Sequence, residues 1–119
     1  MARALPSLRA PEERRRAPRI KVLIDVLIDP ACDGTYVFAR GTAVSADGLF
    51  IQTAQPEPIG TALRLRIDDD GLWLEFEGVV AWTNPPGTID PGMGVRLVRT
   101  RASDRRRLLA LVGRVAYLA

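Results

Sequence analysis

Four arginines between residues 14 and 19 form the group of side chains with the clearest binding chemistry in this sequence: Arg14, Arg15, Arg16 and Arg19. Each guanidinium is a planar, permanently charged fork of five N–H donors, which matches two phosphate oxygens or the O6 and N7 edge of guanine. The first 19 residues carry a net charge of +4, whereas residues 20–119 sum to about −1. The positive charge is therefore local, and it indicates either a ligand-binding arm or a solvated, charged tail.

The turn Ser45-Ala46-Asp47-Gly48 is a second group with polar chemistry, and it falls between two stretches with strand patterns. The Ser45 hydroxyl and the backbone N–H groups of such a turn can donate short hydrogen bonds, and Gly48 permits close backbone approach. A turn serine also commonly closes only its own loop. The sequence therefore leaves open whether Ser45 contacts a ligand.

Catalytic and metal chemistry find no support in the composition. The chain has no histidine, and Cys32 is its only cysteine, which we expect in a loop at a strand end. Nucleophile pairs that use histidine, a four-cysteine zinc site and an intrachain disulfide are thereby excluded. The acids Asp68, Asp69 and Asp70 lack the ligand spacing of a calcium loop. We expect neither an enzyme nor a bound metal or cofactor.

Length and hydropathy indicate one globular domain outside the membrane. A chain of 119 residues with 47% apolar and 26% charged residues is ordinary for a single packed core. It contains no apolar run near the roughly 18 residues of a membrane span. The N-terminus also lacks the apolar centre of a signal peptide. We therefore expect no membrane insertion and a cytoplasmic location.

Period-two alternation of apolar and polar residues begins at Ile20 and predicts a strand that ends at Pro30. We expect Gly41 at a bulge or bend in the next strand, and Asp69-Asp70-Gly71 at a tight hairpin. Six short strands favour a small antiparallel barrel or sandwich. The other five predicted strands cover residues 35–44, 48–54, 60–68, 72–83 and 92–100.

The pattern changes from strand to helix near the C-terminus. Ser103 is expected to cap a helix over residues 103–119, with Asp104 in its first turn. We expect Arg105, Arg106 and Arg107 on its solvated face. Residues 20–95 hold 4 basic and 11 acidic residues, whereas residues 96–119 hold 7 basic residues against one acid. The apolar positions at helical spacing are Leu108, Leu111, Val112 and Val115.

The two tryptophans and the first residues of the chain give further expectations. Trp82 lies on a strand pattern with Val80 and is expected in the core, whereas Trp73 is expected to be partly exposed. Residues 1–12 show no periodicity and are expected to form a flexible tail.

The order of these segments resembles the PilZ domain family over roughly residues 13–116. The resemblance implies a mostly β fold, a six-stranded antiparallel barrel with a C-terminal α-helix. It divides the domain, residues 13–119, into an arm at 13–19, a barrel at 20–100 and a helix at 103–119. The matching segments are Arg15-x-x-x-Arg19, Ser45-x-x-Gly48, Gly78-Val79-Val80-x-Trp82 and Gly92-Met93-Gly94-Val95-x-Leu97.

The resemblance also implies a ligand, the bacterial second messenger cyclic di-GMP. Arg15 and Arg19 match the arginines of the family's RxxxR arm, and Ser45 and Gly48 match its (D/N)xSxxG turn. Arg14 occupies the basic position that accompanies a stacked ligand dimer.

The acidic or amide position of the turn motif falls on Ala43, which cannot pair with guanine, and Asp47 occupies a spacer position. Losing a charge-assisted contact costs roughly 1.5–3 kcal/mol, or about 10–150-fold in affinity. The sequence therefore predicts a weakened site.

Three functions remain open at this stage. The first is a single-domain receptor or adaptor that binds cyclic di-GMP weakly and signals through an unidentified effector protein, in motility, surface polysaccharide or transcription control. The second is a PilZ-like interaction module that has lost the nucleotide, which Ala43 favours. The third is a barrel that binds single-stranded nucleic acid. The acidic middle of the chain and its few aromatic residues disfavour the third.

Overall fold

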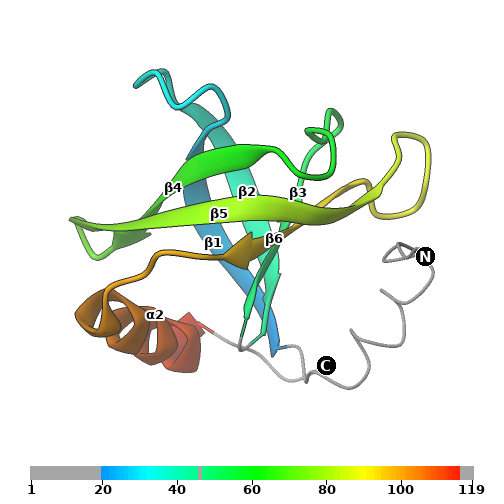
Figure 1. Cartoon of the computed structure of the whole chain (residues 1–119). Helices are drawn as coiled ribbons and strands as arrows, with labels where there is room; N and C mark the ends of the chain where they lie inside the picture. The colour runs from blue at the N-terminus through cyan, green and yellow to red at the C-terminus, as the bar shows by residue number, and fades with distance from the viewer. Residues whose placement is uncertain (1–19, 46, 116–119) are drawn as a thin grey trace.

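The structure, a computed structural model, describes residues 20–45 and 47–115. In this range a closed antiparallel barrel has the strand order β1-β2-β3-β6-β5-β4, with β4 pairing back onto β1 (Figure 1). The predicted mostly β class and the six-stranded barrel with a C-terminal helix are therefore confirmed. The elements are β1 (Ile20–Asp29), β2 (Val37–Val44), β3 (Gly48–Gln52), β4 (Ala62–Asp69), β5 (Leu72–Asn84), β6 (Gly92–Leu97) and α2 (Ala102–Val115).

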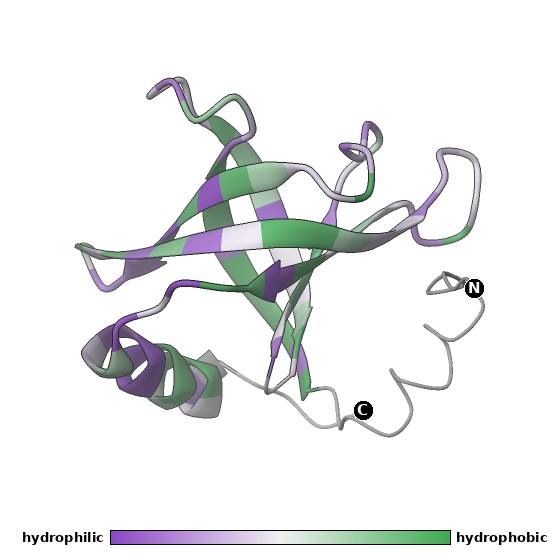
Figure 2. Cartoon of the chain, viewed as in Figure 1, coloured by the Kyte–Doolittle hydropathy of each residue, from purple (hydrophilic) through white to green (hydrophobic). Residues whose placement is uncertain are grey.

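Alternating apolar residues fill the inside of the barrel. Along β4 and β5 hydrophobic and hydrophilic positions follow one another, as the period-two pattern predicts (Figure 2). Burial of each aliphatic side chain contributes roughly 1.5–3 kcal/mol, so this alternation is the main force that selects the strand register. The inward residues of three strands include Val22, Ile24, Val26 and Ile28 of β1, Leu63, Leu65 and Ile67 of β4, and Leu74, Phe76 and Val80 of β5.

Local backbone features bend and connect the strands as the sequence predicts. The β2–β3 register shifts between Gly41 and Ala43, which confirms the bulge expected near Gly41. Asp70 and Gly71 form a two-residue hairpin loop, and both have positive φ values, 57° and 87°. This combination is typical of the type I′ turn that joins twisted antiparallel strands. The Asp68 carboxylate accepts a hydrogen bond from Gly71 N at 2.8 Å.

The end of β1 differs from the sequence expectation. The alternation assigns Asp29 to the outward face, yet its side chain is fully buried because the following loop folds over it. Its carboxylate accepts hydrogen bonds from the backbone N–H groups of Asp33 (3.2 Å) and Gly34 (2.8 Å). Cys32 lies exposed in this loop, as expected. The backbone N–H of Thr35 bonds the Asp33 carboxylate and thereby lowers its pKa below the ordinary value.

Helix α2 covers one end of the barrel, and Leu108, Leu111 and Val112 bury its apolar stripe there (Figure 1). The helix begins one residue earlier than predicted, since Arg105 N donates the first helical hydrogen bond to Arg101 O at 3.0 Å. Arg101 therefore occupies the N-cap position, and the expectation that Ser103 caps the helix is wrong. Residues 116–119 of the predicted helix lie outside the described residues.

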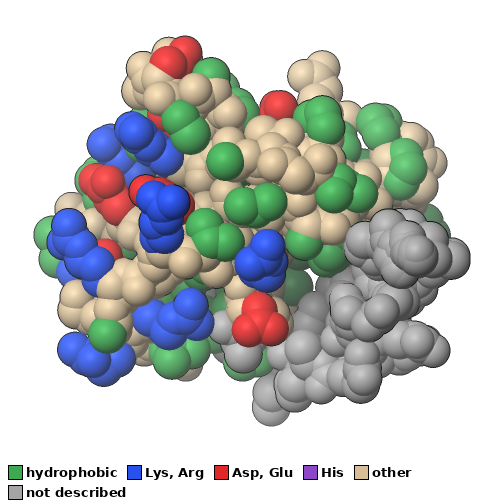
Figure 3. All heavy atoms as spheres, viewed as in Figure 1, with side chains coloured by type: hydrophobic (Ala, Val, Ile, Leu, Met, Phe, Trp, Pro, Cys, Tyr) green, Lys and Arg blue, Asp and Glu red, His purple; other side chains and the backbone are tan. Residues whose placement is uncertain are grey.

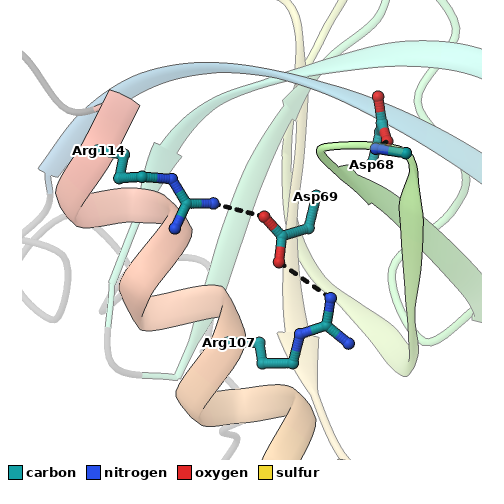
Figure 4. Close-up of polar contacts among 5 residues, drawn as sticks. Asp68, Asp69, Arg107 and Arg114 are labelled. Carbon is teal, nitrogen blue, oxygen red and sulfur yellow. Dashed lines mark hydrogen bonds and ion pairs between the residues drawn. The ribbon is translucent and has the colours of Figure 1, made fainter.

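One carboxylate fixes the side of α2 to the β4–β5 hairpin (Figure 4). Asp69 receives Arg107 Nη2 on one oxygen at 3.1 Å and Arg114 Nη2 on the other at 2.5 Å. The Asp69 side chain is only 12% exposed. Charge-assisted hydrogen bonds to a carboxylate that is largely shielded from water are stronger than the contacts of ordinary surface ion pairs. Asp69 thus sets how the helix lies against the barrel.

The substitution Asp69→Asn tests this contact. It keeps the shape of the side chain but removes its charge, so we expect the free energy of unfolding to fall by about 1–2 kcal/mol. Urea unfolding followed by circular dichroism measures the change. Asp70→Asn, at the exposed hairpin position with positive φ, is the matched control and should stay within about 0.5 kcal/mol of the wild type. Equal stability of the two variants would remove Asp69 from this role.

Candidate functional site

The structure describes one half of the site that the sequence predicts. Arg14, Arg15 and Arg19 lie outside the described residues, whereas Ser45 and Gly48 are within them. The chain connection nevertheless limits where the arm starts. Ile20, the residue after Arg19, pairs with Val44, which directly precedes Ser45. Because neighbouring Cα atoms are about 3.8 Å apart, the arm enters the barrel beside the β2–β3 turn.

The β2–β3 turn is held on both sides by backbone hydrogen bonds. Ser45 N donates to Gly48 O at 2.9 Å, and Leu97 N at the end of β6 donates to Asp47 O at 2.9 Å. The Ser45 side chain is half-buried, and its hydroxyl forms no hydrogen bond within residues 20–45 and 47–115. Within these ranges the hydroxyl therefore does not close the loop.

Gly48 has a structural role in this turn. A Cβ atom at this position would lie 1.9 Å from the carbonyl oxygen of Val95 and 3.0 Å from the Cα of Arg96. No side chain fits there, because β3 and β6 approach each other at this point. The glycine of the motif is therefore required by strand packing, whether or not a ligand also approaches it.

A single row of outward-facing positions crosses five strands next to the turn. Lys21 pairs with Ala43, Ala43 with Phe50, Phe50 with Gly94, and Gly94 with Trp82. Ala43 faces outward in this row because its neighbour Val44 belongs to the core. The position that would carry the acid or amide of the motif thus lies on the outer wall, and it carries only a methyl group.

Two aromatic rings cover the middle of this row. Phe50 and Trp82 stack with their centroids 5.1 Å apart and their planes 18° apart. Gly94 between them leaves room for the stack, since a Cβ there would lie 2.2 Å from Trp82 Nε1. The expectation that Trp82 belongs to the core is wrong. The register of β5 against β6 shifts between Val80 and Trp82, and the extra residue turns the indole to the outer wall.

Arg96 is a further cation beside the turn that the sequence analysis did not single out. It pairs with Gly48 on one side and with Val79 on the other, and it is exposed. The sequence does contain a signal for this position. Met93, Val95 and Leu97 point inward at alternate positions, which leaves Arg96 on the outer face. Phe50 is only 4% exposed, whereas Trp82 is half-buried and Arg96 exposed. The Ser45 hydroxyl, the Arg96 guanidinium and the Trp82 ring on one wall suit a ligand with bases and phosphates.

Residues 20–45 and 47–115 contain no group of acids and cysteine arranged to hold a metal ion. Within the same residues, no helix is both long and apolar enough to cross a membrane. The outer wall around the β2–β3 turn is therefore the candidate functional site.

Comparisons with known proteins agree with this geometry. The model of the PilZ domain family matches residues 13–114. The inhibitor of motility MotI/DgrA from Bacillus subtilis is similar in structure, with 25% identity and a TM-score of 0.66. That match covers 85% of this chain but only 50% of MotI/DgrA, so the chain spans about half the length of that protein.

The PilZ domain of CeSA from a cellulose-synthesizing bacterium has a TM-score of 0.60 at 17% identity, over 82% of this chain and 96% of that one. This likeness concerns the fold alone. The search of curated proteins finds no significant match.

Substitutions at Gly48 and Ser45 separate the structural and ligand-facing parts of the turn. Gly48→Ala should lower the free energy of unfolding by about 1–3 kcal/mol, because β3 and β6 must move apart. Ser45→Ala removes a hydroxyl without a described partner and should change it by less than about 0.5 kcal/mol. Urea denaturation of both variants without nucleotide measures this. If Gly48→Ala is as stable as the wild type, the close approach of the strands does not constrain this position.

Proposed function

The chain belongs to the PilZ domain family, and from this premise we propose that it is a receptor or adaptor that binds cyclic di-GMP and signals through a protein partner. PilZ domains are in general receptors and adaptors for this nucleotide. The observation that carries the proposal is the position of Ile20 beside Val44. Because Arg19 directly precedes Ile20 in the chain, this pairing supports an arm that reaches the wall carrying Ser45.

Each part of the proposed site has a chemical role. We assign binding of the ligand's phosphates and guanine edges to Arg15 and Arg19. A guanidinium can form bidentate hydrogen bonds with a phosphate or with the edge of a guanine. Arg14 is assigned to a second, stacked ligand molecule. Ser45 donates from the turn, and Arg96 adds a cation on its β6 side. Residues 13–19 are thus proposed as the binding arm of the domain, preceded by residues 1–12.

The affinity is proposed to be low. Ala43 leaves the outward position beside Phe50 without a polar atom. The missing contact is worth roughly 1.5–3 kcal/mol. A site that would otherwise bind at micromolar concentration then binds at tens to hundreds of micromolar, by about 1.4 kcal/mol per tenfold.

The output is proposed to be a protein contact rather than catalysis. The similarity to an inhibitor of motility favours motility as the controlled process, although the chain spans only half of that protein. A cytoplasmic location is proposed with this role. The second candidate is a module that works through protein contacts without nucleotide, and the methyl group of Ala43 on the outer wall is the observation that favours it.

Isothermal calorimetry with cyclic di-GMP tests the receptor function. We expect the wild type to bind with a dissociation constant of tens to hundreds of micromolar, and Arg15→Ala and Arg19→Ala to bind at least about tenfold more weakly. Arg64→Ala, on the exposed outer face of β4, is the matched control and should bind like the wild type.

Absence of heat from the wild type up to several hundred micromolar nucleotide, about −5 kcal/mol in binding free energy, would favour the ligand-independent module. If the wild type binds but both arm variants bind equally well, the arm assignment is wrong.

A further inference from the structure

A groove away from the candidate nucleotide site runs between the outer face of β5 and the start of α2. Its volume is about 540 Å³. Trp73, Glu75 and Glu77 line it from β5, Arg64 contributes from β4, and Arg99 and Arg101 contribute from the β6–α2 connection. We call this groove the β5–α2 groove. The family motif uses none of these side chains, so their function is unassigned.

Positive charge gathers around the β5–α2 groove. In residues 96–115, 7 arginines stand against the single acid Asp104, whereas residues 20–95 hold 4 basic and 11 acidic residues. Figure 3 shows Lys and Arg side chains spread over β4, β5 and α2 on this face, with Asp and Glu side chains beside some of them. The C-terminal segment is thus the basic part of the described chain, and in the groove its arginines and Arg64 meet the acids Glu75, Glu77 and Asp104.

Most arginines of the groove have no close acidic partner among the described residues. Arg64 and Arg101 are exposed and form no ion pair with any other residue in 20–45 or 47–115. Arg99 approaches Glu77 only at 3.8 Å, with its side chain 83% exposed. Such a surface contact contributes little. Arg107, in contrast, is engaged by Asp69. The free guanidinium groups at the groove are Arg64, Arg101 and in large part Arg99.

Helix stability does not explain these arginines. The N-cap position favours Ser, Thr, Asp or Asn, whose side chains accept hydrogen bonds, yet here it holds Arg101. The start of a helix also favours acids over bases because of the helix dipole. Asp104 in the first turn follows this preference, whereas Arg101 at the N-cap does not. A position that departs from a local preference without a structural gain among the described residues is typical of a functional surface.

An aromatic side chain completes the groove. Trp73 is 47% exposed and Leu72 beside it is 55% exposed, at the start of β5. Trp and Arg are the residue types most enriched at the energetic centres of protein interfaces. We propose that the β5–α2 groove is the contact surface for an acidic segment of a partner protein, with Arg64 and Arg101 pairing its carboxylates and Trp73 packing on an apolar side chain.

The acids inside the groove decide between a protein and a nucleic acid as the occupant. Glu75, Glu77 and Asp104 line the same groove as the arginines. They would repel an evenly charged phosphate chain, whereas a peptide can place backbone N–H groups or uncharged side chains beside them. The alternation of charges along the groove therefore fits a polypeptide better than a polyphosphate.

This inference deepens the proposed function, because it assigns the contact with the partner, and it rests on the adaptor role without requiring nucleotide binding. The two surfaces are separable by their residues. Arg64→Ala leaves the arm and turn intact, and Arg15→Ala leaves the groove intact. Failure of one assay therefore does not imply failure of the other.

Fluorescence anisotropy with two labelled probes tests the proposal on the full chain without nucleotide. The first probe is a short peptide of Glu and Asp residues around a central Leu-Phe pair, and the second is a single-stranded oligonucleotide of equal net charge. We expect saturable binding of the peptide, and at least about tenfold weaker binding for Arg64→Ala/Arg101→Ala and for Trp73→Ala. Arg40→Ala, on the exposed outer face of β2, removes one charge elsewhere and should leave the affinity unchanged.

Circular dichroism checks that all variants are folded, which their exposed positions favour. Three results would overturn the proposal. The first is no saturable binding of the acidic peptide, and the second is an equal loss of affinity in Arg40→Ala and the groove variants. The third is tighter binding of the oligonucleotide than of the peptide. The last result would assign this face to nucleic acid.

Discussion

The close approach of β6 to its two neighbours is the constraint on which the barrel and its outer wall depend. Gly48, Gly78 and Gly94 lie where a Cβ would come within 1.9 to 2.4 Å of another strand's atoms. A Cβ at Gly48 would meet the backbone of β6, whereas a Cβ at Gly78 or Gly94 would meet the side chain of Val95 or Trp82. Side chains at these points would therefore force β6 away from β3 or disturb its packing against β5. The same contacts anchor the β2–β3 turn and make room for the Phe50–Trp82 stack. The glycines that allow these strands to pack closely thus also shape the candidate functional site.

The candidate site is a product of strand register rather than of a deep pocket. Pairing of Ile20 with Val44 places the end of the arm at the turn, and the row from Lys21 to Trp82 forms the wall beside it. The β5–α2 groove uses the start of β5 and the wall uses Trp82 near its end, so the proposed ligand and partner surfaces involve different residues of the barrel.

Much of the fold was predictable because it depends on local signals. Alternation from Ile20 gave the first strand, and the tight Asp70-Gly71 loop follows from two residues that tolerate positive φ. Trp82 was mispredicted because a bulge, which period-two counting cannot see, reverses the face of the strand. Asp29 is buried by a loop that supplies N–H donors only once folded. Arg96 was overlooked because its importance comes from its pairing with Gly48 across the sheet.

The central claim is that a PilZ nucleotide site persists here and is weakened at one position on the outer wall. Titration of Ala43→Asp with cyclic di-GMP by calorimetry tests it most directly. Because the outward side chain at this position is next to the turn, we predict a dissociation constant at least about tenfold lower than that of the wild type. The gain should disappear in Ala43→Asp/Arg19→Ala, where the arm is impaired. Binding no tighter than the wild type, or a gain that survives the loss of Arg19, would contradict the account.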